Sequence, residues 1–204
     1  MNDERIGGAI LAGGESSRMG KNKAFVRVGG IPIIERVIAR LQPVVDDLAI
    51  ITNTPADYTH LGLPLHTDIL PGKATLGGLY TAIELASTPY TFVVSCDQPF
   101  LNTALLRYLA GLRTGFDVVV PLNQEGYPQS MHALYGKACA GPIRQRLEMD
   151  RLKVIGFFPD VQVREVDADE IDPIDPRRWS FTNVNTPEDL AIARQHAALT
   201  DNQI

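Results

Sequence analysis

The chain has 204 residues, and 19 Lys and Arg against 24 Asp and Glu give it a formal net charge of −5 at pH 7. This acidic balance argues against a general nucleic-acid or anionic-membrane surface, because both need a basic footprint. Hydrophobic residues at 45% and charged residues at 21% are ordinary globular values, which excludes wholesale disorder. No apolar run approaches the roughly 20 residues of a membrane-spanning helix, and the polar start of the chain is unlike a secretory signal. We therefore expect a soluble, cytoplasmic protein with one domain over residues 1–204.

Short apolar runs alternate with segments of helical period along the chain. Strands are predicted over residues 6–11, 48–52, 91–95, 118–120, 130–135 and 162–166, the last at a sheet edge. Helices are predicted near residues 33–41, 77–86, 103–112, 140–149 and 190–199, and residues 167–178 are predicted to form a loop. Pro32 suits a first helical turn, and Thr186 suits the N-cap of the last helix. This order predicts a single three-layer α/β/α domain with a mostly parallel, Rossmann-like sheet.

A glycine-rich segment follows the first predicted strand, from Leu11 to Lys23. Glycines let backbone N–H groups turn inward and form nests that bind phosphate oxygens. Arg18, Lys21 and Lys23 supply positive charge for a polyphosphate. The spacing fits neither a Walker A loop nor the G-x-G-x-x-G fingerprint of dinucleotide-binding folds. The segment therefore predicts a longer phosphate-binding loop of another kind, although a solvated turn has the same composition.

Asp97 comes directly after the apolar strand at residues 91–95. In open α/β sheets, ligands bind beyond the carboxyl ends of the strands, so Asp97 is expected at the same edge as Gly13. A carboxylate facing bound phosphate is repulsive unless a divalent cation lies between them, and Mg²⁺ commonly uses one or two carboxylates with phosphate oxygens. We therefore predict a Mg²⁺ ligand at Asp97; the alternative is that Asp97 only caps the turn before Pro99.

Other chemistries find little support in the sequence. Cys96 and Cys139 form neither a disulfide framework nor a metal-ligand cluster, and Cys96 has no nearby histidine to act as its base. The four histidines show no spacing typical of a zinc site. Nucleophilic thiol chemistry and zinc catalysis are therefore not expected.

Taken together, these segments resemble the molybdenum cofactor guanylyltransferase family of the nucleotidylyltransferase superfamily. The resemblance begins with Leu11-Ala12-Gly13-Gly14 and continues through Arg18-Met19-Gly20 to Lys23. Further motifs follow in the family's order: Asn53, Asp68 before Pro71-Gly72, Leu76-Gly77-Gly78, Cys96-Asp97-Gln98-Pro99, and Asn183-Val184-Asn185-Thr186-Pro187. The chain departs from the family at Asn22, where members often have Asp, and at Ala74-Thr75, which replaces a common Gly-Pro.

The resemblance implies a fold of the nucleotidylyltransferase type, with nucleotide bound by the N-terminal half and the pterin acceptor by the C-terminal half. The implied GTP-binding residues are Leu11, Ala12, Gly13, Gly14, Lys23, Asn53, Asp68 and Asp97. Asp97 is also the implied Mg²⁺ ligand and a catalytic residue, together with Lys23 and Arg18. Asn183 and Asn185 are implied on the pterin side. Singly, the asparagines and Asp68 also fit ordinary turn and cap roles.

The implied reaction transfers GMP from GTP to the terminal phosphate of molybdenum-bearing molybdopterin and releases pyrophosphate. Such in-line transfer needs positioning and charge neutralisation and no general base, because the nucleophile is already an anion. The partners are GTP, a molybdopterin-type pterin phosphate and, as candidates, molybdoenzyme assembly proteins, with neither nucleic acid nor membrane. The alternatives are a cytidylyltransferase, a sugar-phosphate nucleotidylyltransferase, or a non-catalytic nucleotide-binding adaptor.

Overall fold

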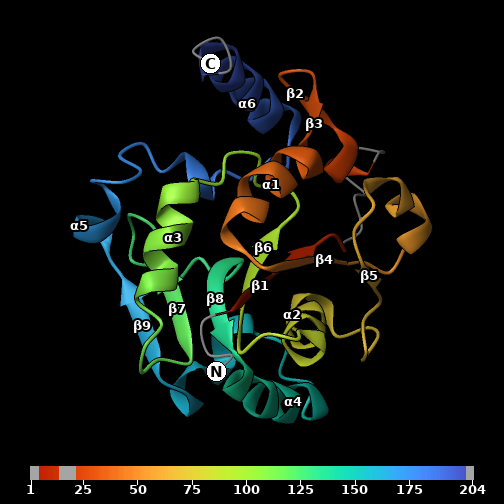
Figure 1. Cartoon of the computed structure of the whole chain (residues 1–204), viewed down its shortest axis with the longest axis vertical. Helices are drawn as coiled ribbons and strands as arrows, with labels where there is room; N and C mark the ends of the chain where they lie inside the picture. The colour runs from red at the N-terminus through yellow and green to blue at the C-terminus, as the bar shows by residue number, and fades with distance from the viewer. Residues whose placement is uncertain (1–4, 14–21, 201–204) are drawn as a thin grey trace.

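The computed structural model describes residues 5–13 and 22–200, and these build a seven-stranded sheet covered by helices on both faces (Figure 1). The strands of this sheet are β1 (Ile6–Leu11), β4 (Asp47–Ile51), β5 (Leu65–His66), β6 (Tyr90–Ser95), β7 (Val118–Pro121), β8 (His132–Gly136) and β9 (Val163–Val166). A separate two-stranded hairpin pairs β2 (Arg27–Val28) with β3 (Ile31–Pro32). The helices are α1 (Ile33–Leu41), α2 (Ala74–Leu85), α3 (Thr103–Gly111), α4 (Ala140–Glu148), α5 (Ala168–Ile171) and α6 (Pro187–Thr200).

The sheet has the order β5-β4-β1-β6-β8-β7-β9. β5, β4, β1 and β6 are parallel neighbours, and β7 is parallel to β9. β8 runs antiparallel to both of its neighbours, β6 and β7. The mostly parallel, Rossmann-like sheet is therefore confirmed, and β9 does lie at the edge.

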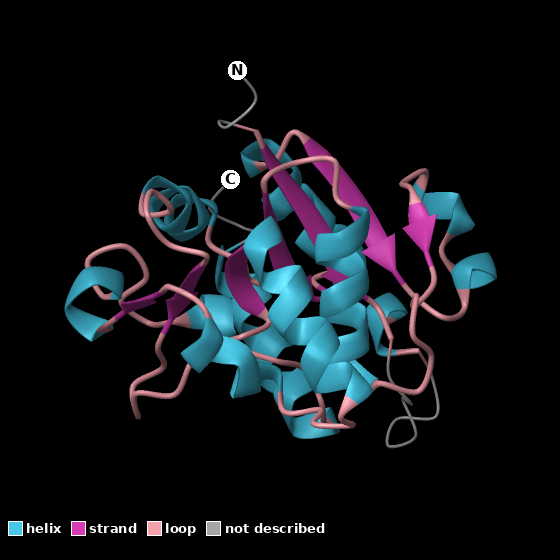
Figure 2. Cartoon of the chain, turned by 90° about the horizontal axis from the view of Figure 1, so that it is seen from below, coloured by secondary structure: helices cyan, strands magenta, loops and turns pink. Residues whose placement is uncertain are grey.

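Two hydrophobic cores lie on the two faces of the sheet, because successive strand residues point in opposite directions. Ile10 of β1 belongs to the core covered by α1, α3 and α6. Its neighbours Ala9 and Leu11 belong to the core covered by α2 and α4. Figure 2 shows helices packed against the strands of the sheet. The predicted three-layer α/β/α arrangement follows from this alternation.

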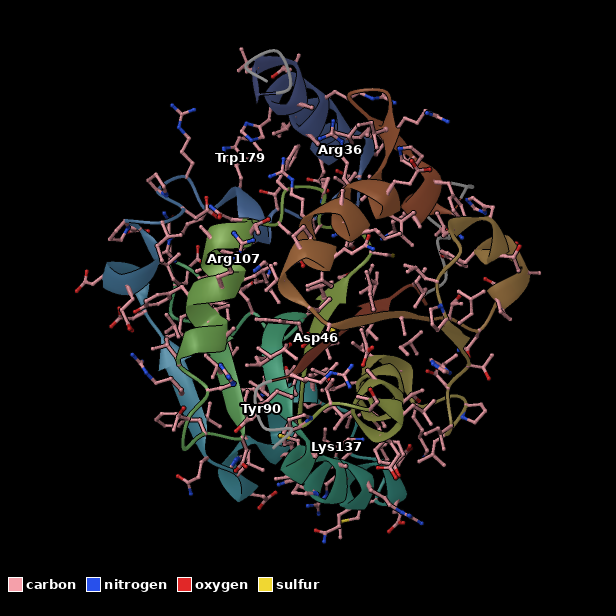
Figure 3. The ribbon with its side chains drawn as sticks, in the orientation of Figure 1. Arg36, Asp46, Tyr90, Arg107, Lys137 and Trp179 are labelled. Carbon is pink, nitrogen blue, oxygen red and sulfur yellow. The ribbon has the colours of Figure 1, made fainter. Side chains whose placement is uncertain are left out.

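Contacts from the C-terminal part of the chain fix both ends of the sheet. At the amino edge, Tyr90 pairs with Gly136, and the N–H of Lys137 donates to the Pro89 carbonyl at 3.0 Å (Figure 3). Near the opposite edge, the indole of Trp179 stacks on the imidazole of His196 in α6, with ring centroids 3.7 Å apart. The Phe100 ring packs edge-on against both Trp179 and His196, so this contact and the pairing of Tyr90 with Gly136 hold the second half of the chain against the first.

Local differences from the sequence prediction have identifiable causes. β2, β3 and β5 were not predicted, because two-residue strands carry no periodic signal. α2 begins at Ala74, three residues before its predicted start, and Pro32 precedes α1 as its N-cap. The predicted loop at residues 167–178 contains α5, which the Asp167 carboxylate caps by accepting hydrogen bonds from the backbone of Asp169 and Glu170. Within the described ranges, no helix is long and apolar enough to cross a membrane.

Candidate active site

The candidate site lies at the carboxyl ends of the parallel strands β1, β4, β5 and β6, which all end on the same side of the sheet. Leu11, the last residue of β1, is in register with Ile51 of β4 and with Ser95 of β6. The predicted residues that follow these four strands are Gly13, Asn53, Asp68 and Asp97. The sheet topology therefore brings them to one edge, as expected for ligand-binding residues of an open α/β sheet.

Asn53 and Asp68 form a reciprocal pair after β4 and β5. The Nδ2 of Asn53 donates to Oδ2 of Asp68 at 2.9 Å, and the Asp68 N–H donates to Oδ1 of Asn53 at 3.2 Å. The other carboxylate oxygen of Asp68 lies near Gly78, where a Cβ would be 3.7 Å from it and 3.4 Å from the Leu11 side chain. The pair is thus fixed close to the end of β1, with polar atoms at the surface.

The start of the glycine-rich loop continues from β1 in an extended path. The Ala12 N–H donates to the Ile51 carbonyl at 2.8 Å. The side chains of Leu11 and Ala12 are buried, whereas Gly13 is exposed. Of these three residues, only Gly13 is exposed to solvent, and the Leu11 carbonyl accepts from the Cys96 N–H and the Ala12 carbonyl from the Tyr58 hydroxyl. Gly14 and Arg18 lie outside the described residues.

Asp97 is half-buried and oriented by its neighbours. Ser95 donates its hydroxyl to Oδ1 of Asp97 at 2.6 Å, and the backbone N–H of Val184 donates to the Asp97 carbonyl at 2.9 Å. The second carboxylate oxygen, Oδ2, has no hydrogen bond to any residue that the structure describes. Ser95 was not among the predicted residues; its place at the strand end, two residues before Asp97, is the signal that identifies it.

Lys23 begins a short 3-10 helix, η1 (Lys23–Phe25), whose N-cap is Asn22. The Asn22 side chain accepts from the Ala24 N–H at 3.1 Å and donates to the buried hydroxyl of Tyr58 at 3.0 Å. The Lys23 ammonium donates to Oδ1 of Asn185 at 2.7 Å. No sequence pattern marks Tyr58, because only the fold brings its hydroxyl to Asn22.

Cys96 directly precedes Asp97, and its thiol is subject to both charged groups of the site. Burial raises the pKa of its thiol to about 12; the Asp97 carboxylate also raises this pKa, and the Lys23 ammonium lowers it. A pKa this high keeps the thiol protonated near neutral pH, in keeping with the expectation that Cys96 is not a nucleophile. Lys23 and Asp97 are linked through adjacent residues, because Asn185 accepts from the Lys23 ammonium at 2.7 Å and the Val184 N–H donates to the Asp97 carbonyl at 2.9 Å.

The predicted pterin-side residues follow the 3-10 helix η7 (Trp179–Phe181). Asn183 is exposed and Asn185 is half-buried. Val184, between them, is the residue hydrogen-bonded to Asp97. The segment 183–185 therefore borders the site formed by β1 and β6, although it lies far from both strands in the sequence.

The carboxylate oxygens available at this site suit Mg²⁺ as the metal. No cluster of three or more His, Cys, Asp or Glu side chains occurs within residues 5–13 and 22–200, so these ranges contain no all-protein metal cage. A single oriented carboxylate with an unpaired oxygen fits Mg²⁺, which usually binds one or two carboxylates and takes its remaining ligands from phosphate and water. The described residues thus fit a cation shared with a bound phosphate.

An open, mostly parallel sheet with polar and charged residues gathered at the carboxyl ends of its strands is the architecture of α/β proteins that bind ligands at that edge. The sequence matches the family model described as a MobA-like NTP transferase domain over residues 8–157, and the chain belongs to this family.

Named relatives agree with this assignment. A probable molybdenum cofactor guanylyltransferase of Carboxydothermus hydrogenoformans is 35% identical over 181 residues, covering 89% of this chain and 91% of the relative. A molybdenum cofactor guanylyltransferase of Desulfosudis oleivorans is 35% identical over 189 residues, covering 92% and 93%. The crystal structure of molybdopterin-guanine dinucleotide biosynthesis protein A from Archaeoglobus fulgidus superposes with a TM-score of 0.82 at 23% identity, over 95% of this chain and 99% of that one. This last similarity shows a shared fold.

Proposed function

We propose that the protein transfers GMP from GTP to the terminal phosphate of a molybdopterin-type pterin and releases pyrophosphate. The observation that carries the proposal is that two adjacent residues contact both charged groups at the carboxyl ends of the strands: the Val184 N–H donates to the Asp97 carbonyl at 2.9 Å, and Asn185 accepts from the Lys23 ammonium at 2.7 Å. The names of the relatives support guanine as the base and molybdopterin as the acceptor. The fold itself serves any nucleotidyl transfer, so the base preference rests on those relatives.

In the proposed reaction, an oxygen of the pterin phosphate attacks the α-phosphorus of GTP in line. A new P–O bond forms as the bond between the α-phosphorus and the bridging oxygen breaks, and pyrophosphate leaves with that electron pair. The attacking oxygen is already anionic, so no side chain needs to remove a proton. The protein therefore contributes positioning and charge neutralisation.

Each proposed site residue has one of these tasks. Lys23 and Arg18 neutralise charge that builds on the leaving pyrophosphate. Asp97, oriented by Ser95, holds Mg²⁺, which when bound neutralises phosphate oxygens and orients them for attack. The main chain of Leu11, Ala12, Gly13 and Gly14 and the side chains of Asn53 and Asp68 hold the nucleotide. Asn183 and Asn185 line the acceptor side, which divides one 1–204 domain into a nucleotide half and an acceptor half.

Pyrophosphate release, measured with GTP and with CTP in the presence of molybdenum-bearing molybdopterin, tests the proposal. Turnover with GTP should be strongly preferred; a preference for CTP would make the protein a cytidylyltransferase. Asp97→Asn should lower turnover by at least about 100-fold while leaving the fold intact. Glu84→Gln is the matched control, because this exposed carboxylate lies on the last turn of α2, away from the carboxyl edge.

Tight GTP binding with no Mg²⁺-dependent turnover in the wild-type protein would favour the non-catalytic adaptor instead. Near wild-type turnover in Asp97→Asn would remove the metal role of Asp97.

A further inference from the structure

A single turn of the C-terminal part of the chain contacts both charged groups of the site. The Val184 N–H donates to the Asp97 carbonyl at 2.9 Å, and Oδ1 of the next residue, Asn185, accepts from the Lys23 ammonium at 2.7 Å. One link is to main chain and the other is to a side-chain tip. The separation of Asp97 and the Lys23 ammonium is therefore set in part by a segment that belongs to neither strand end.

The first turn of α6 fixes this segment. The N–H groups of Asn185 and Thr186 both donate to Oδ2 of Asp189 at 2.9 Å. In return, the Asp189 N–H donates to the Thr186 hydroxyl at 3.1 Å. Such reciprocal capping anchors the main chain at a helix start. The amide oxygen of Asn185 thus projects from a backbone position that is already held.

Of the two charged groups, the Lys23 ammonium is the one whose position depends most on such a fixed acceptor. Its backbone is set by the Asn22 cap of η1, but a lysine side chain has a flexible four-carbon stem and a large rotamer entropy. A neutral amide oxygen takes one of the three ammonium protons and leaves two for an anion. It also leaves the positive charge intact, whereas a carboxylate in its place would neutralise it. Asn185 therefore orients the ammonium and preserves its attraction for phosphate.

We infer that Asn185 is a positioning residue that acts through Lys23, so that the acceptor-side segment sets the place of the phosphate-binding ammonium. This inference rests on the proposed function and gives Asn185 a task on the nucleotide side. It also explains why the acceptor-side turn is tied to both Asp97 and Lys23: the two charges must keep one spacing for the triphosphate that they bind together.

A double-mutant cycle with Asn185→Ala and Lys23→Met tests the inference through kcat/KM for GTP at saturating acceptor. Asn185→Ala should lower kcat/KM about tenfold in the wild-type background and less than about twofold in the Lys23→Met background, because its effect requires the ammonium. Asn183→Ala, the neighbouring asparagine, is the control and should cause the same fold-change in both backgrounds. A merely structural role of Asn185 would not depend on Lys23.

The outcomes separate this inference from the proposed function. If GTP is turned over and Asn185→Ala loses the same factor in both backgrounds, the inference is wrong and the proposed function stands. If GTP is not turned over, the proposed function fails, and the same cycle is measured as the Kd of whichever nucleoside triphosphate binds. If Asn185→Ala changes this Kd by the same factor in the wild-type and Lys23→Met backgrounds, the inference is wrong. A larger change in the wild-type background supports it.

Discussion

The buried side chain of His132 should lower the free energy of unfolding of the protein at acidic pH. This residue of β8 is completely buried, and neither ring nitrogen has a hydrogen-bond partner among the described residues. Its imidazole packs edge-on against Phe181, with ring centroids 5.1 Å apart, and its strand position pairs with Val94, just before the Asp97 segment. Burial lowers the pKa of His132 from 6.5 to about 3, because the charged ring would lose its hydration with no partner to replace it.

The sign of the effect follows from the unfolded chain. Above pH 6.5 the imidazole is neutral in both states, so His132 contributes no pH dependence. Below pH 6.5 the unfolded chain binds a proton that the folded protein excludes, and the stability falls until the folded protein also takes up the proton near pH 3. At pH 5 the loss is about 2 kcal/mol, from about 1.4 kcal/mol per pH unit over the 1.5 units below the unfolded pKa.

Urea unfolding at pH 8 and pH 5, followed by circular dichroism, measures this loss in the wild type and in His132→Leu. The variant should lose about 2 kcal/mol less between the two pH values than the wild type does. A packing cost of the substitution is the same at both pH values and cancels. His60→Leu, which removes an exposed imidazole, should keep the wild-type dependence. Equal pH dependence in the wild type and in His132→Leu would refute the argument from burial.

Three further predictions concern the phosphate site and the start of α2. Lys23→Ala should lower kcat/KM for GTP about 100-fold through lost phosphate contacts, and an unchanged value in the pyrophosphate assay would remove Lys23 from the site. Ala74→Gly should raise the free energy of unfolding by about 1 kcal/mol, because Ala74 has a left-handed φ of +48°; a lower stability in urea would contradict this. Gly77→Ala should cost about 2 kcal/mol, because its Cβ would lie 2.9 Å from the Lys73 Cβ and 3.2 Å from the Leu70 carbonyl oxygen. Gly78→Ala, with its closest atom at 3.4 Å, should be tolerated. Urea unfolding measures both variants, and equal losses of stability would count against the packing argument.

Much of the fold could be predicted because its signals are local. The apolar run at Ile6–Leu11 and the helical spacing at Ile33–Leu41 coincide with β1 and α1. The Thr186 cap also forms as predicted, because an N-cap needs only its own first turn. The departure at Ala74 has a physical meaning as well. Ala74 occupies a position with positive φ, where a glycine would be unstrained.

The site could be predicted only as a collection of strand-end residues. Gly13 and Asp97 were expected at one edge because both follow buried strands, and the parallel register of β1 with β6 confirms it. The orientation of these side chains could not be predicted. Ser95 on Asp97, Tyr58 on Asn22 and Asn185 on Lys23 are contacts that depend on which segments the fold brings together.

The sequence by itself determined the longer strands and helices and which polar residues follow the strands, because hydrophobic period and turn chemistry act over a few residues. The two-residue strands and the short helix α5 carry too few residues for such a signal. The tertiary structure alone decided that β8 runs antiparallel between β6 and β7, since the same alternation of side chains serves either direction. It alone also decided that the turn before α6 meets Lys23 and Asp97. Those contacts join residues far apart along the chain, so they can form and stabilise the site only after the sheet has formed and α6 has packed on it.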